Sequence, residues 1–151
     1  MLHVALWEPE IPPNTGNIAR TCAATGTALH LIGRLGFRLD DRSLRRAGCD
    51  YWVDVDVRYH ASLEDFEAAL GDCRILPFSA HGSVAFTAID YRSGDCLLFG
   101  SESQGLSERI LQRYPQKPLQ IPMATDKVRS LNLATAAGIA LYEALRQLQS
   151  W

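Results

Sequence analysis

The sequence has no excess of basic charge and no long apolar run. Its 15 lysine and arginine residues are outnumbered by 17 acidic residues, which gives a net charge of −2. Any contact with nucleic acid must therefore come from a local basic patch rather than from an overall positive field. No apolar stretch approaches the roughly 20 residues that cross a bilayer. The short apolar run at the start is followed by acidic residues, so we expect neither a membrane span nor a signal peptide.

Closely spaced cysteines are also missing. The four cysteines, at positions 22, 49, 73 and 96, form no C-x-x-C pair. Zinc ribbons and thioredoxin-type redox motifs are therefore unsupported. We expect buried, reduced thiols in a cytoplasmic protein without a metal site.

The common glycine-rich signatures of nucleotide-binding proteins and hydrolases are absent too. The spacing of Gly100 and Gly105 fits a phosphate loop, but Leu106 follows where that loop needs lysine. No G-x-G-x-x-G follows the first predicted strand, and no G-x-S-x-G nucleophile elbow occurs. The four histidines form no recognisable pair of nucleophile and base.

The sequence does contain short apolar runs that alternate with helical patterns. Strands are predicted at residues 2–7, 28–32, 51–57, 74–78, 84–89, 95–99 and 118–121. Helices are predicted at 15–25, 62–70, 107–111 and 130–149, with Asn14, Ser62 and Ser107 as N-caps and Asp40 or Asp41 capping a further short helix. This alternation predicts one α/β domain over residues 1–151, with a mostly parallel sheet and helices on both faces.

Three polar, glycine-punctuated segments follow predicted strands and lead into helices. They are residues 14–22, 99–106 and 121–133. Open α/β sheets bind ligands at such loops, so the three segments predict one composite site. Ser130 either caps the last helix or presents its hydroxyl to a ligand. Arg20 is either a solvated helix charge or a site residue, in which case it could pair with Glu102, whose carboxylate would be costly to bury alone.

An arginine cluster follows the second predicted strand. Five arginines lie between positions 34 and 46 with only two acidic residues among them. The cluster is either a solvated face or a local patch that binds phosphates. The small residues of the last helix, from Ala134 to Ala140, either pack inside the fold or let a second helix approach closely.

The three segments together resemble the SPOUT superfamily of RNA methyltransferases. More narrowly, the chain resembles the small tRNA 2′-O-methyltransferases that act on the wobble nucleotide. The resemblance is carried by residues 8–20, 44–51, 99–106, 121–123 and 129–133, and it covers essentially the whole chain. It implies an α/β fold with a deep C-terminal trefoil knot, a homodimer, and an enzyme that uses S-adenosylmethionine to methylate the anticodon stem-loop of tRNA.

The resemblance also implies roles for particular residues. The positions that match the cofactor site are Phe78, Gly100, Ile121, Met123, Ser130 and Leu131. The catalytic group is expected to be Arg20, with Glu102 and Asn132 orienting it or the ribose. The expected RNA-binding residues are Arg34, Arg42, Arg45, Arg46, Arg129 and Tyr142. Gln104 departs from the arginine or threonine that relatives often carry, which puts any substrate contact there in doubt. The alternatives are another tRNA position, ribosomal RNA, or a non-catalytic RNA-binding module.

Overall fold

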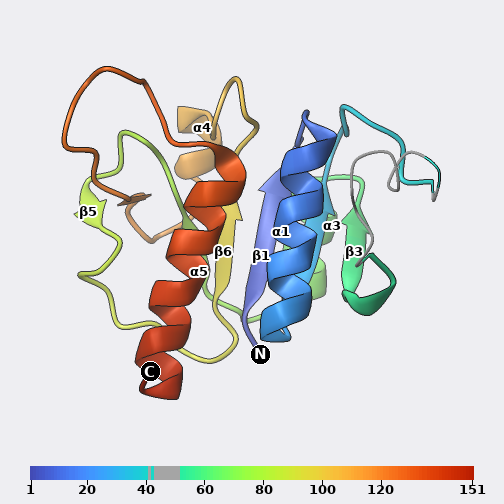
Figure 1. Cartoon of the computed structure of the whole chain (residues 1–151), viewed down its shortest axis with the longest axis horizontal. Helices are drawn as coiled ribbons and strands as arrows, with labels where there is room; N and C mark the ends of the chain where they lie inside the picture. Colours follow the sequence, from blue (N-terminus) through green and yellow to red (C-terminus); the bar gives the residue numbers. More distant parts are fainter. Residues whose placement is uncertain (41, 43–51) are drawn as a thin grey trace.

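The computed structural model describes residues 1–40, 42 and 52–151. Five parallel strands form the main sheet in the order β3-β2-β1-β6-β4, and two further strands form a small second sheet (Figure 1). The strands of the main sheet are β1 (His3–Trp7), β2 (Ala28–Ile32), β3 (Val57–His60), β4 (Ile75–Pro77) and β6 (Cys96–Phe99). The small sheet pairs β5 (Val84–Ala85) with β7 (Leu119–Gln120).

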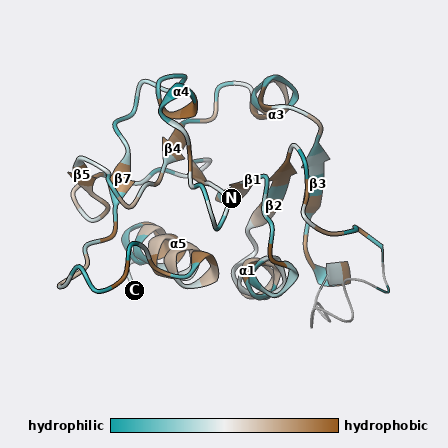
Figure 2. Cartoon of the chain, turned by 90° about the horizontal axis from the view of Figure 1, so that it is seen from above, coloured by the Kyte–Doolittle hydropathy of each residue, from teal (hydrophilic) through white to brown (hydrophobic). Residues whose placement is uncertain are grey.

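Helices cover both faces of the main sheet. The helical elements are α1 (Pro12–Thr25), η1 (Trp52–Asp54), α3 (Leu63–Leu70), α4 (Glu108–Leu111) and α5 (Leu133–Gln149). Helices α1 and α5 lie side by side on one face, while α3 and α4 cover the other (Figure 2). The predicted α/β class with a mostly parallel sheet is confirmed. The trefoil knot and the single domain over residues 1–151 stay predictions.

Alternating side chains of the central strands supply a separate core on each face. Val4 and Leu6 of β1 belong to the larger cluster, which includes Ile18 of α1 and Leu141 of α5. Ala5, which points the other way, belongs to the cluster around Phe66 of α3. Burial on both faces explains why β1, β2 and β6 are nearly continuous apolar runs. None of the described helices combines the length and the apolar composition that a membrane span needs.

The strand predicted at residues 51–57 is wrong. The chain forms the short helix η1 there, and its strand begins only at Val57, which pairs with Leu29 of β2. Trp52 and Val55 pack against the core while Val53 is 88% exposed. Inward residues three positions apart suit a turn rather than an extended chain. Tyr51 and the short helix expected after Asp40 or Asp41 lie largely outside the described residues.

Of the three predicted helix caps two are confirmed and one is wrong, and one of the two readings of Ser130 is excluded. Ser62 and Ser107 accept hydrogen bonds from the backbone N–H groups of Asp65 and Ile110. Asn14 is not an N-cap, because α1 begins two residues earlier with Pro12 and Pro13, which have no N–H to satisfy. At α5, Asn132 rather than Ser130 is the N-cap and accepts from Thr135 N at 3.1 Å.

Three histidines form a hydrogen-bonded row across neighbouring strands. His3 Nδ1 and His30 Nε2 are 3.0 Å apart, and His30 Nδ1 and His60 Nε2 are 2.9 Å apart. Burial, followed by the nearby His3 and His60 rings, lowers the pKa of His30 to about 3, and burial also lowers the pKa values of His3 and His60. In a row of neutral rings both nitrogens of His30 are paired, because each neutral imidazole has one donor and one acceptor.

This row is expected to make the fold sensitive to acid. The unfolded chain protonates His30 below its ordinary pKa of 6.5, whereas the folded chain does so only near about 3. Above pH 6.5 His30 is neutral in both states, and the fold is most stable. As the pH falls below 6.5 only the unfolded chain takes up the proton, so the free energy of unfolding decreases by up to about 1.4 kcal/mol per pH unit for this one proton. Chemical unfolding measured between pH 7 and 5 should show a shallower pH dependence for His30→Phe than for wild type. Equal slopes would contradict the prediction.

Candidate functional site

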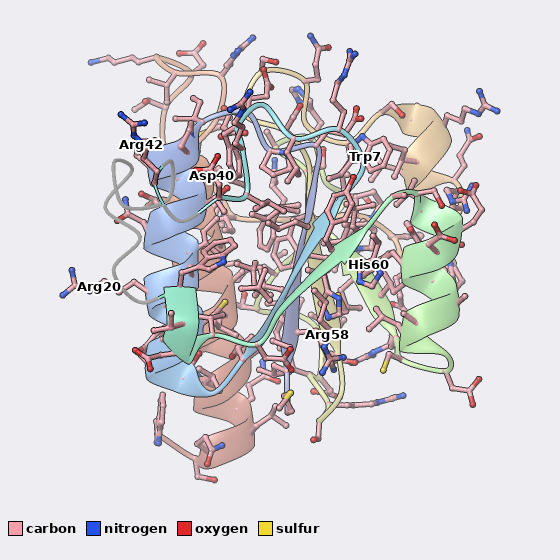
Figure 3. All side chains as sticks on the ribbon, turned by 90° about the vertical axis from the view of Figure 1, so that its right-hand side faces the viewer. Trp7, Arg20, Asp40, Arg42, Arg58 and His60 are labelled. Atoms are coloured by element: carbon pink, nitrogen blue, oxygen red, sulfur yellow. The ribbon has the colours of Figure 1, made fainter. Side chains whose placement is uncertain are left out.

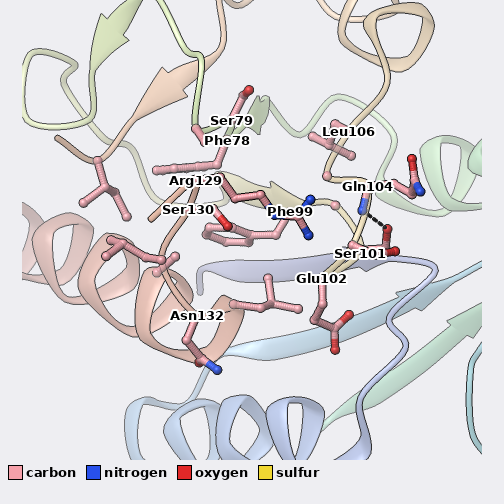
Figure 4. Close-up of a pocket in the computed structure, with 18 of the residues that line it drawn as sticks. Phe78, Ser79, Phe99, Ser101, Glu102, Gln104, Leu106, Arg129, Ser130 and Asn132 are labelled. Atoms are coloured by element: carbon pink, nitrogen blue, oxygen red, sulfur yellow. Dashed lines mark hydrogen bonds between the residues drawn. The ribbon is translucent and has the colours of Figure 1, made fainter. Parts of the chain in front are cut away.

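A cavity of about 460 Å³ lies at the carboxyl end of the main sheet, where the polar segments meet. Its wall is formed by residues 78–81 after β4, residues 99–106 after β6, and residues 129–133 at the start of α5 (Figure 4). Ile11 and Asn14 at the start of α1, Leu119, Ile121 and Met123 in and after β7, and Ala136 of α5 also line it. All six residues that the resemblance assigns to the cofactor line this one cavity, namely Phe78, Gly100, Ile121, Met123, Ser130 and Leu131.

The cavity has an apolar wall and a polar wall. The rings of Phe78 and Phe99 stack with their centres 4.8 Å apart. Ser130, Glu102 and Asn132 line the same cavity from the other segments. Small-molecule sites commonly combine an apolar surface with a few polar groups that fix orientation. Among the described residues, no group of three or more histidine, cysteine or acidic side chains could hold a metal ion.

The loop of residues 100–105 folds back tightly on itself. Gly105 N donates to Ser101 O at 2.8 Å, and Gln104 N donates to Ser101 Oγ at 3.2 Å. A Cβ atom on Gly100 would lie 2.0 Å from the carbonyl carbon of Gly105. The glycine is therefore required by the loop's own backbone, whereas the sequence suggested only close approach to a ligand.

Glu102 does not pair with Arg20. Its carboxylate accepts hydrogen bonds from the backbone N–H groups of Glu10 and Ile11, at 2.9 and 2.7 Å, and from Asn14 Nδ2 at 3.3 Å. The charge of Glu102 is thus satisfied by groups just before and at the start of α1. The sequence could not indicate this arrangement, because backbone donors carry no sequence signal.

Asn14 connects two of the predicted site residues and was missed as a site residue. Its side chain is buried, donates to Glu102, and accepts a hydrogen bond from Asn132 Nδ2 at 3.0 Å. Asn132 in turn caps α5. A chain of side-chain contacts therefore fixes the starts of α1 and α5 against the loop after β6. In the sequence, the only feature that placed Asn14 near the site was its position in the first polar segment.

A second carboxylate holds the same loop. Ser103 donates its backbone N–H and its hydroxyl to Glu10 Oε1, at 3.0 and 2.5 Å. These hydrogen bonds lower the pKa of the Glu10 carboxyl below its usual value. Glu10 therefore stays ionised at neutral pH and forms charge-assisted hydrogen bonds.

The predicted catalytic arginine lies outside this cavity. Arg20 is exposed on α1, on the side away from the sheet, and does not line the cavity of its own chain (Figure 3). Of the predicted RNA-binding residues, Arg129 lines the cavity, while Arg34, Arg42 and Tyr142 are exposed elsewhere. Arg45 and Arg46 lie outside the described residues. Gln104 lies at the cavity with an exposed side chain.

Comparisons with known proteins find relatives that align with nearly the whole chain. An Escherichia coli (strain K12) protein named tRNA (cytidine(34)-2'-O)-methyltransferase is 46% identical over 149 residues, covering 98% of this chain and 94% of that protein. A solved structure described as giving insights into the 2-OH methylation of C/U34 on tRNA has a TM-score of 0.93 and 53% identity over 100% of this chain and 98% of that one.

More distant structures share the fold as well. The SpoU methyltransferase AviRb from Streptomyces viridochromogenes, in complex with AdoMet, has a TM-score of 0.82 and 29% identity over 100% of this chain and 62% of that one. Residues 1–142 match the model of the SpoU rRNA Methylase family. With this match and with relatives that align along nearly its whole length, the chain belongs to the SpoU rRNA methylase family.

Proposed function

We propose that this protein transfers a methyl group from S-adenosylmethionine to the ribose 2′-oxygen of the wobble nucleotide of tRNA, either cytidine or a modified uridine. The convergence of three distant polar segments on one cavity carries the proposal. The name of the Escherichia coli relative and the description of the C/U34 structure support this choice of target.

The residues around the cavity fit the methyl donor. A volume of about 460 Å³ lies within the range of small-molecule sites. The Phe78 and Phe99 rings offer an apolar wall for a purine base, and the Ser130 hydroxyl offers a polar contact. When bound, the sulfonium donor supplies an electrophilic methyl group. The protein must then orient the ribose oxygen and stabilise its developing negative charge.

We assign that charge stabilisation to Arg20 of the partner subunit in a homodimer. A guanidinium keeps its proton at ordinary pH, so Arg20 binds the neighbouring phosphate and the developing alkoxide rather than acting as a base. Glu102 and Asn132 act as positioning residues through Asn14. Because Arg20 lies on the side of α1 away from the sheet and does not line the cavity of its own chain, a second subunit is the source that fits the geometry.

The exposed face of α1 and α5 supports this dimer. Ile139 is 39% exposed and Tyr142 is 47% exposed on α5. A Cβ atom on Gly138 would meet nothing within 4 Å, so a second helix has room to approach there. Ala136 of α5 and Ile11, the residue just before α1, both line the cavity, so this face reaches the edge of the site.

We propose that RNA binds to the exposed arginines that follow β2 and to Arg129 beside the cavity. Arg34 and Arg42 are exposed, and Arg129 stands at the cavity itself. The same role is proposed for Arg45, Arg46 and Tyr142. A local patch of this kind can bind phosphates although the whole chain is slightly acidic. The free cysteines of the described residues agree with a proposed cytoplasmic place of action.

Labelling of tRNA tests the proposed function directly. The protein is incubated with unmodified tRNA and methyl-labelled S-adenosylmethionine, and the nucleosides are identified by mass spectrometry. We expect label on the ribose of nucleotide 34 and on no other nucleotide. Label at another tRNA position, or on ribosomal RNA as the family's description would suggest, overturns the choice of target while keeping the chemistry. No label with any RNA would overturn the enzyme itself.

A further inference from the structure

Residues 8–11 connect β1 to α1 and are held by the loop that forms the cavity wall. Glu102 accepts the backbone N–H groups of Glu10 and Ile11, and Ser103 donates its N–H and its hydroxyl to Glu10 Oε1. Each of the two segments therefore contributes a carboxylate that accepts hydrogen bonds from the other: Glu102 from residues 10 and 11, and Glu10 from Ser103. Displacement of the loop must displace residues 10 and 11 or break these hydrogen bonds.

Residues 8–11 also hold residues 34–40, the segment after β2 that bears Arg34 and Arg38 and is called the arginine-bearing segment below. Gly36 N donates to Pro9 O at 2.9 Å, and Arg34 N donates to Glu8 Oε2 at 3.0 Å. A Cβ atom on Gly36 would lie 2.7 Å from both Cα and O of Glu10, so the two backbones are in direct contact. Glu10 therefore touches the cavity loop with its side chain and the arginine-bearing segment with its backbone.

These contacts are better suited to positioning than to stabilising the fold. Glu10 and Ser103 are exposed, and neither belongs to a core cluster. Hydrogen bonds at exposed positions contribute little to global stability. They can still decide where a loop lies, because a ligand that orders one partner reduces the ordering cost for the other.

We propose that Glu10 is a positioning residue that couples the cavity to the arginine-bearing segment, so that methyl-donor binding and RNA binding tighten each other. The inference rests on the proposed function for the identity of the two ligands. It adds that residues 8–11 transmit the occupancy of one site to the other. Such coupling is reciprocal: each ligand must change the affinity of the other by the same factor.

Binding measurements with S-adenosylhomocysteine and an anticodon stem-loop RNA test the coupling without turnover, since the probe has no methyl group to transfer. For the wild-type protein, we expect saturating RNA to tighten the probe about tenfold, and saturating probe to tighten the RNA by the same factor. Titration calorimetry measures all four affinities. A wild-type protein that binds both ligands independently overturns the proposal.

Three variants locate the coupling at Glu10. Glu10→Ala removes the acceptor of both Ser103 donors, and the coupling should fall to about twofold or less. Glu10→Gln keeps an oxygen that can accept both donors, and should restore the coupling to within about twofold of wild type. Asp72→Ala removes the same charge from an exposed position at the other end of the sheet, and should leave the coupling intact.

Thermal unfolding of the three variants should match wild type within a few degrees, because the substituted side chains are exposed. Wild-type coupling in Glu10→Ala, or failure of Glu10→Gln to restore it, overturns the role of Glu10. The labelling experiment tests a different proposal. A protein that couples the two ligands but labels another nucleotide overturns the proposed target and leaves the coupling intact. RNA that does not bind at all overturns the coupling together with the proposed function.

Discussion

Replacement of Gly100 by alanine is expected to abolish binding of S-adenosylhomocysteine, with an affinity loss of more than about 100-fold. The added Cβ atom would lie 2.0 Å from Gly105 C and 2.3 Å from Leu106 N, both of which are backbone atoms. No side-chain rotation can relieve such contacts, so residues 100 and 105 must move apart. The separation would break the Gly105–Ser101 hydrogen bond and displace the cavity wall.

Gln104→Ala is the matched control in the same loop. The Gln104 side chain is exposed, and the hydrogen bond to Ser101 uses only the Gln104 backbone N–H. We expect its probe affinity to stay within about threefold of wild type. Titration calorimetry compares the two variants, and circular dichroism checks that the Gly100→Ala protein keeps its sheet and helices. Near-normal binding by folded Gly100→Ala would show that the loop does not form the site.

The parallel α/β architecture could be predicted because its central strands are buried on both faces. Residues 28–32 are buried at every position of β2, and residues 96–99 at every position of β6. Apart from His30 in β2, these strands are apolar at every position, which is a strong local signal. The serine caps of α3 and α4 were equally predictable, since a hydroxyl before a helix has few other uses. The strand predicted at residues 51–57 was wrong because alternating valine and aspartate fit an exposed turn as well as a strand.

The membership of the site was more predictable than its internal contacts. Polar loops at the carboxyl ends of parallel strands must meet at one edge, so the cavity residues followed from strand order and the resemblance. The partners of Glu102 did not follow, since two of its three donors are backbone N–H groups. Spacing along α1 also left the direction of Arg20 open. A helix of that length presents residues to the sheet and to solvent in every turn.

Replacement of Arg20 by alanine is expected to lower methyl transfer by about 1,000-fold or more. The guanidinium is assigned to the developing alkoxide and its neighbouring phosphate, and an alanine can stabilise neither. Probe affinity should stay within about twofold of wild type, because the phosphate and the developing alkoxide to which Arg20 is assigned both belong to the RNA and neither is part of the probe. Single-turnover transfer of labelled methyl groups to tRNA measures the effect. Arg109→Ala, which changes an exposed arginine on α4, should transfer normally.

Mixed dimers decide which subunit supplies the arginine. An Arg20→Ala subunit keeps an intact cavity, and a Gly100→Ala subunit keeps an intact Arg20. If Arg20 acts across the dimer, a mixed dimer has one complete site, and a randomly exchanged equal mixture should reach about one quarter of the wild-type rate. If Arg20 acts within its own chain, no mixed dimer has a complete site and the mixture stays inactive. Sedimentation of the mixture must show dimers, since full activity in monomers would contradict the composite site as well.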